Sequence, residues 1–512
     1  MTSAASYNAA VDLVERNLSV GQRERIAYID DIGRHTFADL DRRVRQASAM
    51  LRARGIQPEQ RILLCMHDSF ELPVMFLGAI RAGIVPVLAN TLLTPDDYAF
   101  LLNDSRAQLA VVSAALASQF ESIIDTVPLL LADGPRGALD AALREASGDD
   151  SAAATGADEP CFWLYSSGST GRPKGTVHAH SSLSDTARLY GKPVLGITGQ
   201  DVVFSAAKLF FAYGLGNALS FPLSVGATTV LMAERPTPEA VFQRLQEHAV
   251  SIFYGVPTLY ASLLASAGLP SGDTLHLRRC TSAGEALPRD LGERWRTHFG
   301  VDILDGIGST EMLHIFLSNR PDDLRYGTTG RAVDGYELRI VDEQDAPVPA
   351  GEIGELLVKG PTAALMYWNN RARSRRTFCG EWTRTGDKYH LDQDGYYVYC
   401  GRSDDMLKVG GIYVSPAEVE SALISHAAVL EAAVVGCADD ENLVKPLAFV
   451  VPAPGTEPDE ELAEALKLHV KQALAPYKYP RWIRFTDALP KTATGKIQRF
   501  KLRELSNDPP IG

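Results

Sequence analysis

Residues 161–176, CFWLYSSGSTGRPKGT, constrain the fold more than any other stretch of this chain. The apolar run 161–165 predicts a buried strand that ends in a loop dense in hydroxyl groups and glycine. Such a loop gathers backbone N–H groups and hydroxyls around one point beside the Lys174 ammonium, which makes a cradle for phosphate oxygens. The alternative is a plain surface turn with one exposed lysine. An ordinary P-loop hydrolase is disfavoured, because Lys174 is followed by Gly175 and Thr176 and the G-x-x-x-x-G-K-[ST] spacing is absent.

Composition describes a globular protein of at least two domains. The 512 residues are 46% hydrophobic and 22% charged, which is more chain than one core normally serves. A net charge of −13 without a run of Lys or Arg argues against nucleic-acid binding. The six widely spaced cysteines predict neither a zinc site nor a disulfide framework, and they favour a cytoplasmic setting. We expect no signal peptide and no membrane span, because charged and helix-breaking residues interrupt the longest apolar run, 72–89.

Alternating patterns predict an α/β fold for most of the chain. Residues 36–55 predict a helix that Thr36 caps and Gly55 ends. A strand at 61–66, a helix at 71–81 and a strand at 84–88 then predict a parallel βαβ unit. Similar alternation recurs as far as residue 254, so we expect βαβ-type sheets covered by helices on both faces. The Ala-, Gly- and Asp-rich stretch 132–159 is interpreted as a solvated connector.

The predicted secondary structure changes twice in the last third of the chain. Short strands separated by turn residues after about residue 325 predict a small antiparallel β unit. The last hundred residues predict a compact α+β module, which opens with a capping box from Ser415 to Glu418 and contains a second amphipathic helix at 460–475. We therefore expect a large N-terminal domain, 1–403, followed by a small mobile C-terminal domain, 404–512.

Four further motifs follow the phosphate loop in a fixed order. They are DGIGSTE at 305–311, WTRTGD at 382–387, YCGRSDDMLKVGG at 399–411 and PKTATGKIQR at 490–499. Each motif alone is also typical of a plain turn or a solvated lysine. All four in this order after the phosphate loop make a chance match to one family very improbable. Together they closely resemble the adenylate-forming enzymes: acyl- and aryl-CoA ligases, firefly luciferase and the adenylation domains of peptide synthetases. The resemblance runs from about Tyr7 to Leu505.

The resemblance implies two half-reactions. The carboxylate of an acid attacks the α-phosphate of ATP, giving an acyl-adenylate and pyrophosphate, and a thiol then displaces AMP. ATP, Mg²⁺ and coenzyme A are the implied cofactors and co-substrates. The implied nucleotide site consists of Ser166, Ser167, Gly168, Ser169, Thr170, Gly171, Lys174, Gly284, Glu285, Ala286, Asp305, Gly306, Ile307, Thr310, Asp387, Arg402 and Lys496.

The resemblance also implies individual roles. The loop from Ser166 to Lys174 would hold the β- and γ-phosphates, Thr310 would touch the α-phosphate, and Glu311 would bind Mg²⁺. Lys496 would reach the carboxylate and the α-phosphate during adenylation, so that Lys174, Thr310 and Lys496 form the implied catalytic set. These assignments make physical sense, because adenylation needs fixed cations where negative charge develops. Ser169 stands where threonine is more usual in the family, and it keeps the hydroxyl.

Other positions would serve the ribose and the thiol. Asp387 would accept hydrogen bonds from the ribose hydroxyls with help from Arg402. Asp404 would be the hinge between the two domain orientations. The implied residues along the pantetheine tunnel are Lys408, Gly410 and Gly411, where glycine lets the backbone approach a thin ligand.

The choice of acid is implied by residues 208–217, KLFFAYGLGN, and by the residues after Glu311. No carboxylate occurs within 208–217, so an amino-acid substrate is disfavoured. An apolar slot fits an aromatic ring, although such a stretch also suits a core, and His314 is equally compatible with a core position or a pocket wall. The candidate acid-binding residues are Phe211, Ala212, Tyr213, Gly214, Ala283, Ile307, Gly308, His314 and Ile315. The strings around them resemble the benzoate-CoA ligase branch.

The leading functional hypothesis is therefore an AMP-forming benzoate-CoA ligase of aromatic-acid degradation. The alternatives are a ligase for a 4-hydroxy-, 2-amino- or halo-substituted benzoate, and an enzyme that loads an aryl acid onto a carrier protein. A silent scaffold is disfavoured, because all the implied catalytic residues are present. We expect an aromatic acid, ATP and coenzyme A as partners, and neither nucleic acid nor membrane. Dimers are common in the family, so a homodimer is one assembly to expect, although the residues identify no interface.

Overall fold

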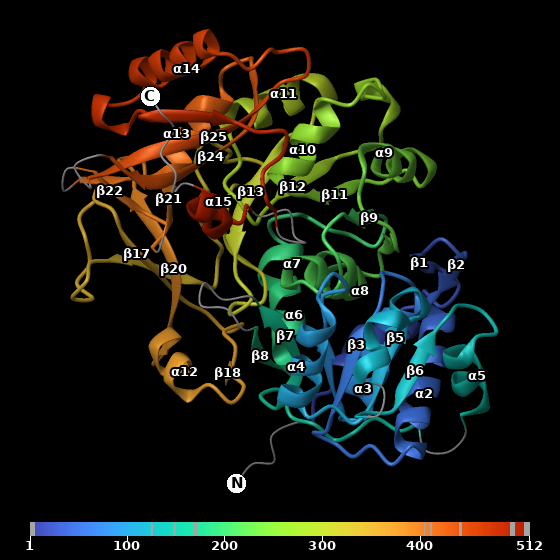
Figure 1. Cartoon of the computed structure of the whole chain (residues 1–512). Helices are drawn as coiled ribbons and strands as arrows, with labels where there is room; N and C mark the ends of the chain where they lie inside the picture. Colours follow the sequence, from blue (N-terminus) through green and yellow to red (C-terminus); the bar gives the residue numbers. More distant parts are fainter. Residues whose placement is uncertain are drawn as a thin grey trace.

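The structure, a computed structural model, describes residues 6–123, 126–146, 150–166, 173–403, 405–409, 412–439, 443–491 and 497–505. Within these ranges the strands form two large and mainly parallel sheets, a smaller antiparallel sheet, and the sheets of a carboxy-terminal α+β module (Figure 1). The predicted α/β class is confirmed.

The first sheet contains the βαβ unit predicted near the amino terminus. Its strands in spatial order are β18 (Met366–Tyr367), β8 (Lys174–Ala179), β7 (Pro160–Ser166), β4 (Val85–Leu88), β3 (Arg61–Cys65), β5 (Ala110–Ser113) and β6 (Leu129–Ala132). The strands from β7 to β6 are parallel, whereas β8 and β18 are added antiparallel at one edge. This edge brings β8, which begins at Lys174, beside β18, a segment from far along the chain.

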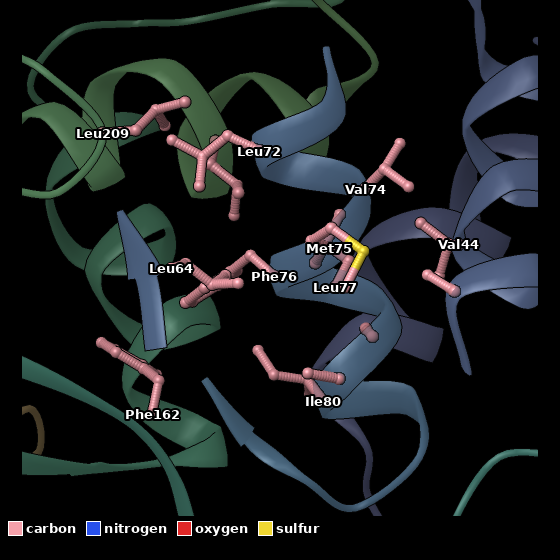
Figure 2. Packing of buried hydrophobic residues seen from close by; sticks show 14 of the residues in the cluster. Val44, Leu64, Leu72, Val74, Met75, Phe76, Leu77, Ile80, Phe162 and Leu209 are labelled. Atoms are coloured by element: carbon pink, nitrogen blue, oxygen red, sulfur yellow. The ribbon is translucent and has the colours of Figure 1, made fainter. Parts of the chain in front are cut away.

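Helices cover both faces of the first sheet, as predicted. One face packs on α1 (Ala9–Ser19), α2 (Phe37–Ala53) and α3 (Glu71–Arg81), and the other packs on α4 (Pro95–Ser105) and the 3-10 helix η1 (Ala114–Ile123). The side chains of β3 alternate between the two cores, with Leu64 on the α3 side and Leu63 on the α4 side. Figure 2 shows Phe76 of α3 beside Leu64, and Leu72 of α3 facing Leu209, which comes from a distant loop.

The second sheet combines the middle of the chain with its amino-terminal hairpin. Its strands in spatial order are β15 (Arg331–Ala332), β14 (Ile315–Ser318), β13 (Ile303–Gly308), β12 (Arg279–Ser282), β11 (Ile252–Gly255), β9 (Val202–Ser205), β10 (Thr228–Val230), β1 (Ile26–Ile29) and β2 (Arg34–Thr36). Strand β1 pairs parallel to β10, with Tyr28 opposite Thr229. Helices α9 (Pro238–Glu247), α10 (Pro257–Leu264) and α11 (Arg289–Phe299) pack on one face.

The opposite face of the second sheet packs on helices that connect it to the first sheet, and on the third sheet. The connecting segments are α6 (His180–Thr186), the π-helical turns η2 (Ala187–Gly191) and η3 (Gly216–Ser220), α7 (Ala212–Leu215) and α8 (Phe221–Val225). The third sheet is antiparallel, as predicted, and consists of β16 (Glu337–Val341), β17 (Gly354–Lys359), β20 (Trp382–Leu391), β19 (Phe378–Cys379) and β21 (Tyr397–Arg402). Helix α12 (Arg371–Thr377) precedes β19.

The carboxy-terminal module lies against the second and third sheets at the top of the view in Figure 1. Its elements are β22 (Leu407–Val409), β23 (Ile412–Val414), α13 (Pro416–Ile424), β24 (Val429–Ala438), β25 (Val444–Pro452), α14 (Glu460–Ala473), β26 (Trp482–Phe485) and α15 (Arg499–Leu505). The predicted α+β character is confirmed. The division at residue 404 stays a prediction.

Two local predictions were wrong. The stretch 132–159 is not simply a solvated connector, because α5 (Ala138–Glu145) buries Leu139 and Leu143 in the core that α2 shares. The capping box at α13 is half formed. The Ser415 hydroxyl accepts the Glu418 N–H, but the Glu418 carboxylate accepts instead from Lys478 Nζ at 2.6 and 2.7 Å.

None of the described helices is both long enough and apolar enough to cross a bilayer.

Candidate active site

Lys174, Glu311 and Tyr367 form a closed triangle of hydrogen bonds at the end of the first sheet. Lys174 Nζ donates to Glu311 Oε1 at 2.7 Å and to the Tyr367 hydroxyl at 2.8 Å. The Tyr367 hydroxyl in turn donates to Glu311 Oε1 at 2.7 Å. Strand pairing brings Tyr367 and Lys174 together, because Tyr367 lies opposite Thr176 in the β18–β8 ladder, close to Lys174 at the start of β8. Lys174 is the last residue of the predicted phosphate loop, so the triangle includes one end of that loop.

Both charges of this triangle are largely buried. Burial raises the pKa of Glu311, but the Lys174 charge and the hydrogen bonds from Lys174 and Tyr367 outweigh it and lower that pKa to about 2. Burial lowers the pKa of Lys174, and Glu311 offsets part of this effect. Glu311 Oε1 accepts both bonds, so Oε2 takes no part in the triangle. A carboxylate oxygen outside such a pairing suits a hard cation such as Mg²⁺, which prefers oxygen ligands.

Thr310 is fixed through its backbone by a buried histidine. His178 Nε2 lies 2.8 Å from the Thr310 carbonyl oxygen, and because a carbonyl only accepts, Nε2 carries the proton. Burial lowers the pKa of His178 to about 4, so the ring is neutral at pH 7, and it stacks on Phe162 of β7. The loop from Thr310 to Glu311 is therefore held from β8.

Asp387 and Arg402 lie directly opposite each other on β20 and β21. Arg402 Nη1 donates to Asp387 Oδ1 and to the Thr385 carbonyl oxygen, each at 3.0 Å. The pair that the resemblance assigns to the ribose is therefore brought together by strand register. The Asp387 side chain is buried, which suits a carboxylate that accepts from vicinal hydroxyls.

The predicted adenine residues occupy the turn after β12 and the end of β13. Gly284 has φ +98°, a left-handed conformation that favours glycine. The buried Asp305 carboxylate accepts the Leu287 N–H at 3.5 Å, and burial raises the pKa of Asp305 to about 8. Ala286 lies in the same turn, and Gly306 and Ile307 continue β13. Glu285 Oε1 accepts the Ile497 N–H at 3.0 Å, so the residue after Lys496 contacts this turn.

Tyr213 and His314 lie at the centre of the predicted acid slot, with ring centroids 5.5 Å apart. The Tyr213 hydroxyl is 2.6 Å from Thr281 Oγ1. His314 Nε2 lies 3.2 Å from the Tyr213 carbonyl oxygen and 3.1 Å from Asn217 Oδ1, so Nε2 is the donor. Burial lowers the pKa of His314 to about 3. The two side chains at this predicted site are therefore aromatic and neutral at pH 7.

The other predicted acid residues divide between two cores. Ala283 and Ile315 belong to the core that Tyr213 and Ile307 contact. Ala212 belongs to the core of the first sheet, and Phe211 packs against that core. Two glycines have no room for a Cβ atom: at Gly214 it would lie 2.0 Å from the Lys208 carbonyl oxygen, and at Gly308 it would lie 2.5 Å from the His314 carbonyl oxygen.

Several predicted site residues lie outside the described residues: Ser167, Gly168, Ser169, Thr170, Gly171, Asp404, Gly410, Gly411 and Lys496. Ser166 is described, and it lies opposite Lys174 in the β7–β8 ladder. The backbone of Lys408 belongs to β22, where it pairs with Tyr413.

Sequence reasoning missed Tyr367 and His178. Both act through contacts between strands and loops that are far apart in the chain, at separations of 56 residues for Tyr367 and Glu311 and 132 residues for His178 and Thr310. The local signal was weak, because a tyrosine or histidine within an apolar run usually belongs to the core.

The family now follows from comparison with known proteins. Residues 15–368 match the AMP-binding enzyme family, and residues 418–496 match the AMP-binding enzyme C-terminal domain. The chain belongs to this family, and the predicted resemblance to the adenylate-forming enzymes, in their benzoate-CoA ligase branch, is confirmed.

Particular relatives cover almost the whole chain. The benzoate–CoA ligase of Thauera aromatica is 60% identical over 504 residues, which are 97% of this chain and 96% of that protein. A solved benzoate CoA ligase from Burkholderia xenovorans LB400 is 57% identical, with a TM-score of 0.92, over 97% of this chain and 100% of that one. The anthranilate CoA ligase AuaEII, solved in complex with anthranoyl-AMP, is 44% identical with a TM-score of 0.94 over 98% of each chain.

Proposed function

We propose that this chain is an AMP-forming benzoate-CoA ligase, which converts benzoate, ATP and coenzyme A into benzoyl-CoA, AMP and pyrophosphate. The observation that carries the proposal is the neutral aromatic pair Tyr213 and His314 at the predicted acid site, on a chain 60% identical to a benzoate–CoA ligase. Such a pair fits an unsubstituted ring, because it offers aromatic faces and edges and no charge to pair with a ring substituent.

Adenylation uses the cationic side of the site. A carboxylate oxygen of benzoate attacks the α-phosphorus of ATP, and the bond from that phosphorus to the bridging oxygen of pyrophosphate breaks. Negative charge grows on the phosphoryl oxygens and on the departing pyrophosphate, so a fixed ammonium beside them lowers the barrier. Lys174 would supply this ammonium, and its hydrogen bonds to Glu311 and Tyr367, which hold its Nζ, support the proposal.

Glu311 Oε2 would hold Mg²⁺ that arrives with the nucleotide, and the ion would supply further neutralisation of the phosphates. Glu311 Oε1 stays bound to Tyr367 in this arrangement, which fixes the direction of the open oxygen.

Thioester formation follows at the same acyl group. The thiol of coenzyme A attacks the acyl carbon of the benzoyl-adenylate, the carbon–oxygen bond to AMP breaks, and the thiol proton goes to solvent or to a base. Asp387, oriented by Arg402, would hold the ribose of the nucleotide. A cytoplasmic location, where ATP and coenzyme A are available, is part of the proposal.

A second candidate is a ligase for a substituted benzoate. The 44% identity to an anthranilate CoA ligase favours this alternative, and an apolar slot discriminates between close ring analogues by only about 1–3 kcal/mol.

The test is AMP release from Mg-ATP with a panel of acids, each with and without coenzyme A. The panel contains benzoate, 4-hydroxybenzoate, 2-aminobenzoate, cyclohexanecarboxylate, octanoate and phenylalanine. We expect sustained turnover that needs both benzoate and coenzyme A, with octanoate and phenylalanine inert. Benzoate-dependent pyrophosphate exchange without turnover of coenzyme A would instead indicate loading of a carrier protein. Silence with every acid contradicts the proposal.

A further inference from the structure

The segment that forms one wall of the acid slot, residues 207–214, is here named the acid loop. It is tightly folded, because the Phe211 N–H donates to the Lys208 carbonyl oxygen at 3.0 Å and Gly214 packs directly on that carbonyl. Lys208 Nζ donates to the carbonyl oxygens of Met232 and Glu234, the latter at 2.7 Å, and so ties the loop to the segment after β10. Polar contacts therefore help to fix the position of the loop.

Asp68 makes the polar contact from the other sheet. It lies in the turn between β3 and α3, and its residue is 3% exposed. Its two carboxylate oxygens lie 3.2 and 3.3 Å from the Leu209 backbone nitrogen, whose N–H they accept. Burial raises the pKa of Asp68 to about 6, with the Lys208 charge and the Leu209 N–H opposing the rise. The carboxylate thus contacts the acid loop at its most buried point.

The acid loop joins two separate cores. Leu209 packs in the core of the first sheet, facing Leu72 of α3 in Figure 2. Tyr213, four residues later, packs against the core of the second sheet. A shift of the loop relative to the first sheet therefore moves Tyr213 relative to His314, which belongs to the other half of the slot.

We propose that Asp68 is a positioning residue of the acid slot, which sets the affinity and selectivity for the aromatic acid by holding the Leu209 N–H. The inference rests on the proposed function, because it takes the slot around Tyr213 as the acid site. A buried N–H without an acceptor is costly, so the loop would move to find one if Asp68 were removed. The nucleotide residues Lys174, Glu311 and Asp387 make no hydrogen bond to Asp68 or to the acid loop among the described contacts.

Two substitutions separate positioning from charge. Asp68→Ala removes the acceptor, whereas Asp68→Asn keeps an oxygen that accepts the Leu209 N–H and removes only the charge. Asp140→Ala is the matched control, because Asp140 is also a buried carboxylate of the first half, accepts the Arg136 N–H at 3.0 Å, and lies on α5 away from the acid loop. If Asp68→Ala does not fold, Asp68→Ser serves, since its shorter side chain stops short of Leu209.

The measurements are the KM values for benzoate and for ATP, the benzoate to 4-hydroxybenzoate preference, and the rise in Tm on adding benzoate or ATP. We expect Asp68→Ala to raise the KM for benzoate on the order of tenfold, corresponding to one lost buried hydrogen bond, and to reduce the preference. The KM of Asp68→Ala for ATP should stay within about twofold of the wild-type value. Both KM values of Asp68→Asn should stay within about threefold, and both KM values of Asp140→Ala should be unchanged.

Several results would overturn this role. They are an unchanged benzoate KM in a folded Asp68→Ala variant, an equal rise for benzoate and ATP, or an Asp68→Asn variant as impaired as Asp68→Ala. Wild-type turnover is measured first, so that an absence of turnover with all acids contradicts the proposed function and not the role of Asp68. The Tm rise then still decides on Asp68: at the same benzoate concentration it must be clearly smaller for Asp68→Ala than for the wild type and Asp68→Asn, and any other pattern contradicts the inference.

Discussion

At the scale of single residues, the two described cations of the predicted nucleotide site each have a carboxylate partner in the protein. Lys174 is paired with Glu311, and Arg402 with Asp387. Burying unpaired charges is costly, and these pairs reduce that cost. When ATP binds, Lys174 would exchange its bond to Glu311 for one to a phosphate, and Asp387 would exchange its bond to Arg402 for one to a ribose hydroxyl. Tyr367, the third member of the triangle, then becomes important for holding Lys174 and Glu311 in place.

We predict that Tyr367→Phe raises the KM for Mg-ATP by at least roughly tenfold, because two hydrogen bonds to charged partners, Lys174 and Glu311, are lost, and leaves the KM for benzoate nearly unchanged. Initial-rate kinetics check this. Tyr326→Phe is the control, since Tyr326 also donates to a carboxylate, Asp302 Oδ1, at 2.9 Å, outside the site. Equal effects of the two substitutions would contradict a specific role for Tyr367.

Asp305 gives a pH-dependent prediction. Its folded pKa of about 8 lies above the usual value of 3.8 because of burial. The folded state therefore holds the proton more tightly, and the stabilisation is complete below about pH 4 and is lost as the pH rises towards 8. Relative to Asp305→Asn, the wild type should lose roughly 1 kcal/mol of unfolding free energy per pH unit within this window.

Urea unfolding of both proteins at pH 5 and pH 8 measures the difference. The exposed Asp487→Asn serves as the control. If the difference in unfolding free energy between the wild type and Asp305→Asn does not change with pH, Asp305 does not titrate in this range.

The motifs predicted the charged residues of the candidate site but not the residues that hold the site in position. Lys174, Glu311, Asp387 and Arg402 lie within continuous strings whose order identified the family. Asp68, in contrast, acts on a backbone N–H 141 residues away, and that contact exists only because two sheets pack together. A single buried aspartate after a strand predicts a turn or a cap, and nothing in its neighbourhood indicates the partner.

At the scale of elements, the acid loop shows how a glycine shapes a binding wall. We predict that Gly214→Ala lowers kcat/KM for benzoate on the order of 100-fold, because the new Cβ would meet the Lys208 carbonyl oxygen at 2.0 Å and the backbone must open. Gly268→Ala is the control, since its nearest neighbour would be Ser266 Oγ at 3.7 Å. Steady-state kinetics and Tm measure both, and a folded Gly214→Ala variant with normal kcat/KM would contradict the assignment.

Elements with strong local signals were predicted well. The cap and apolar face of α2 and the β3–α3–β4 unit follow from sequence periodicity and capping, and the structure confirms them. Helix α5 was missed because alanine, glycine and aspartate dominate its surroundings, and only Leu139 and Leu143 bury much apolar surface. Its helical state depends on packing against α2, which a local pattern does not reveal.

At the scale of the whole molecule, residues 497–499 of the carboxy-terminal module contact the turn after β12. Ile497 N donates to Glu285 Oε1 at 3.0 Å, and Arg499 Nη2 binds both oxygens of the buried Glu420 at 2.8 Å. Arg499 thus binds its own module, while Ile497, two residues earlier, contacts the turn that is predicted to hold adenine.

We predict that Lys496→Ala reduces benzoyl-adenylate formation at least about 100-fold, the usual cost of one lost charge-stabilising group, and spares thioester formation from supplied benzoyl-adenylate. Separate assays of the two half-reactions check this. Lys491→Ala is the control, because Lys491 belongs to the same segment but pairs with Glu431 at 2.7 Å. Equal losses in both half-reactions would contradict the assigned role.

The position of β1 and β2 limits how this protein can be recombined with its relatives. These strands precede the entire first sheet in the chain, yet β1 borders β10 of the second sheet. A chimera that exchanges the predicted acid-recognition half as one continuous stretch would leave a foreign β1–β2 hairpin against the new sheet, with mismatched side chains in its core. Successful grafting of a new acid preference therefore needs two crossover segments, with the amino-terminal hairpin transferred together with the residues that read the acid.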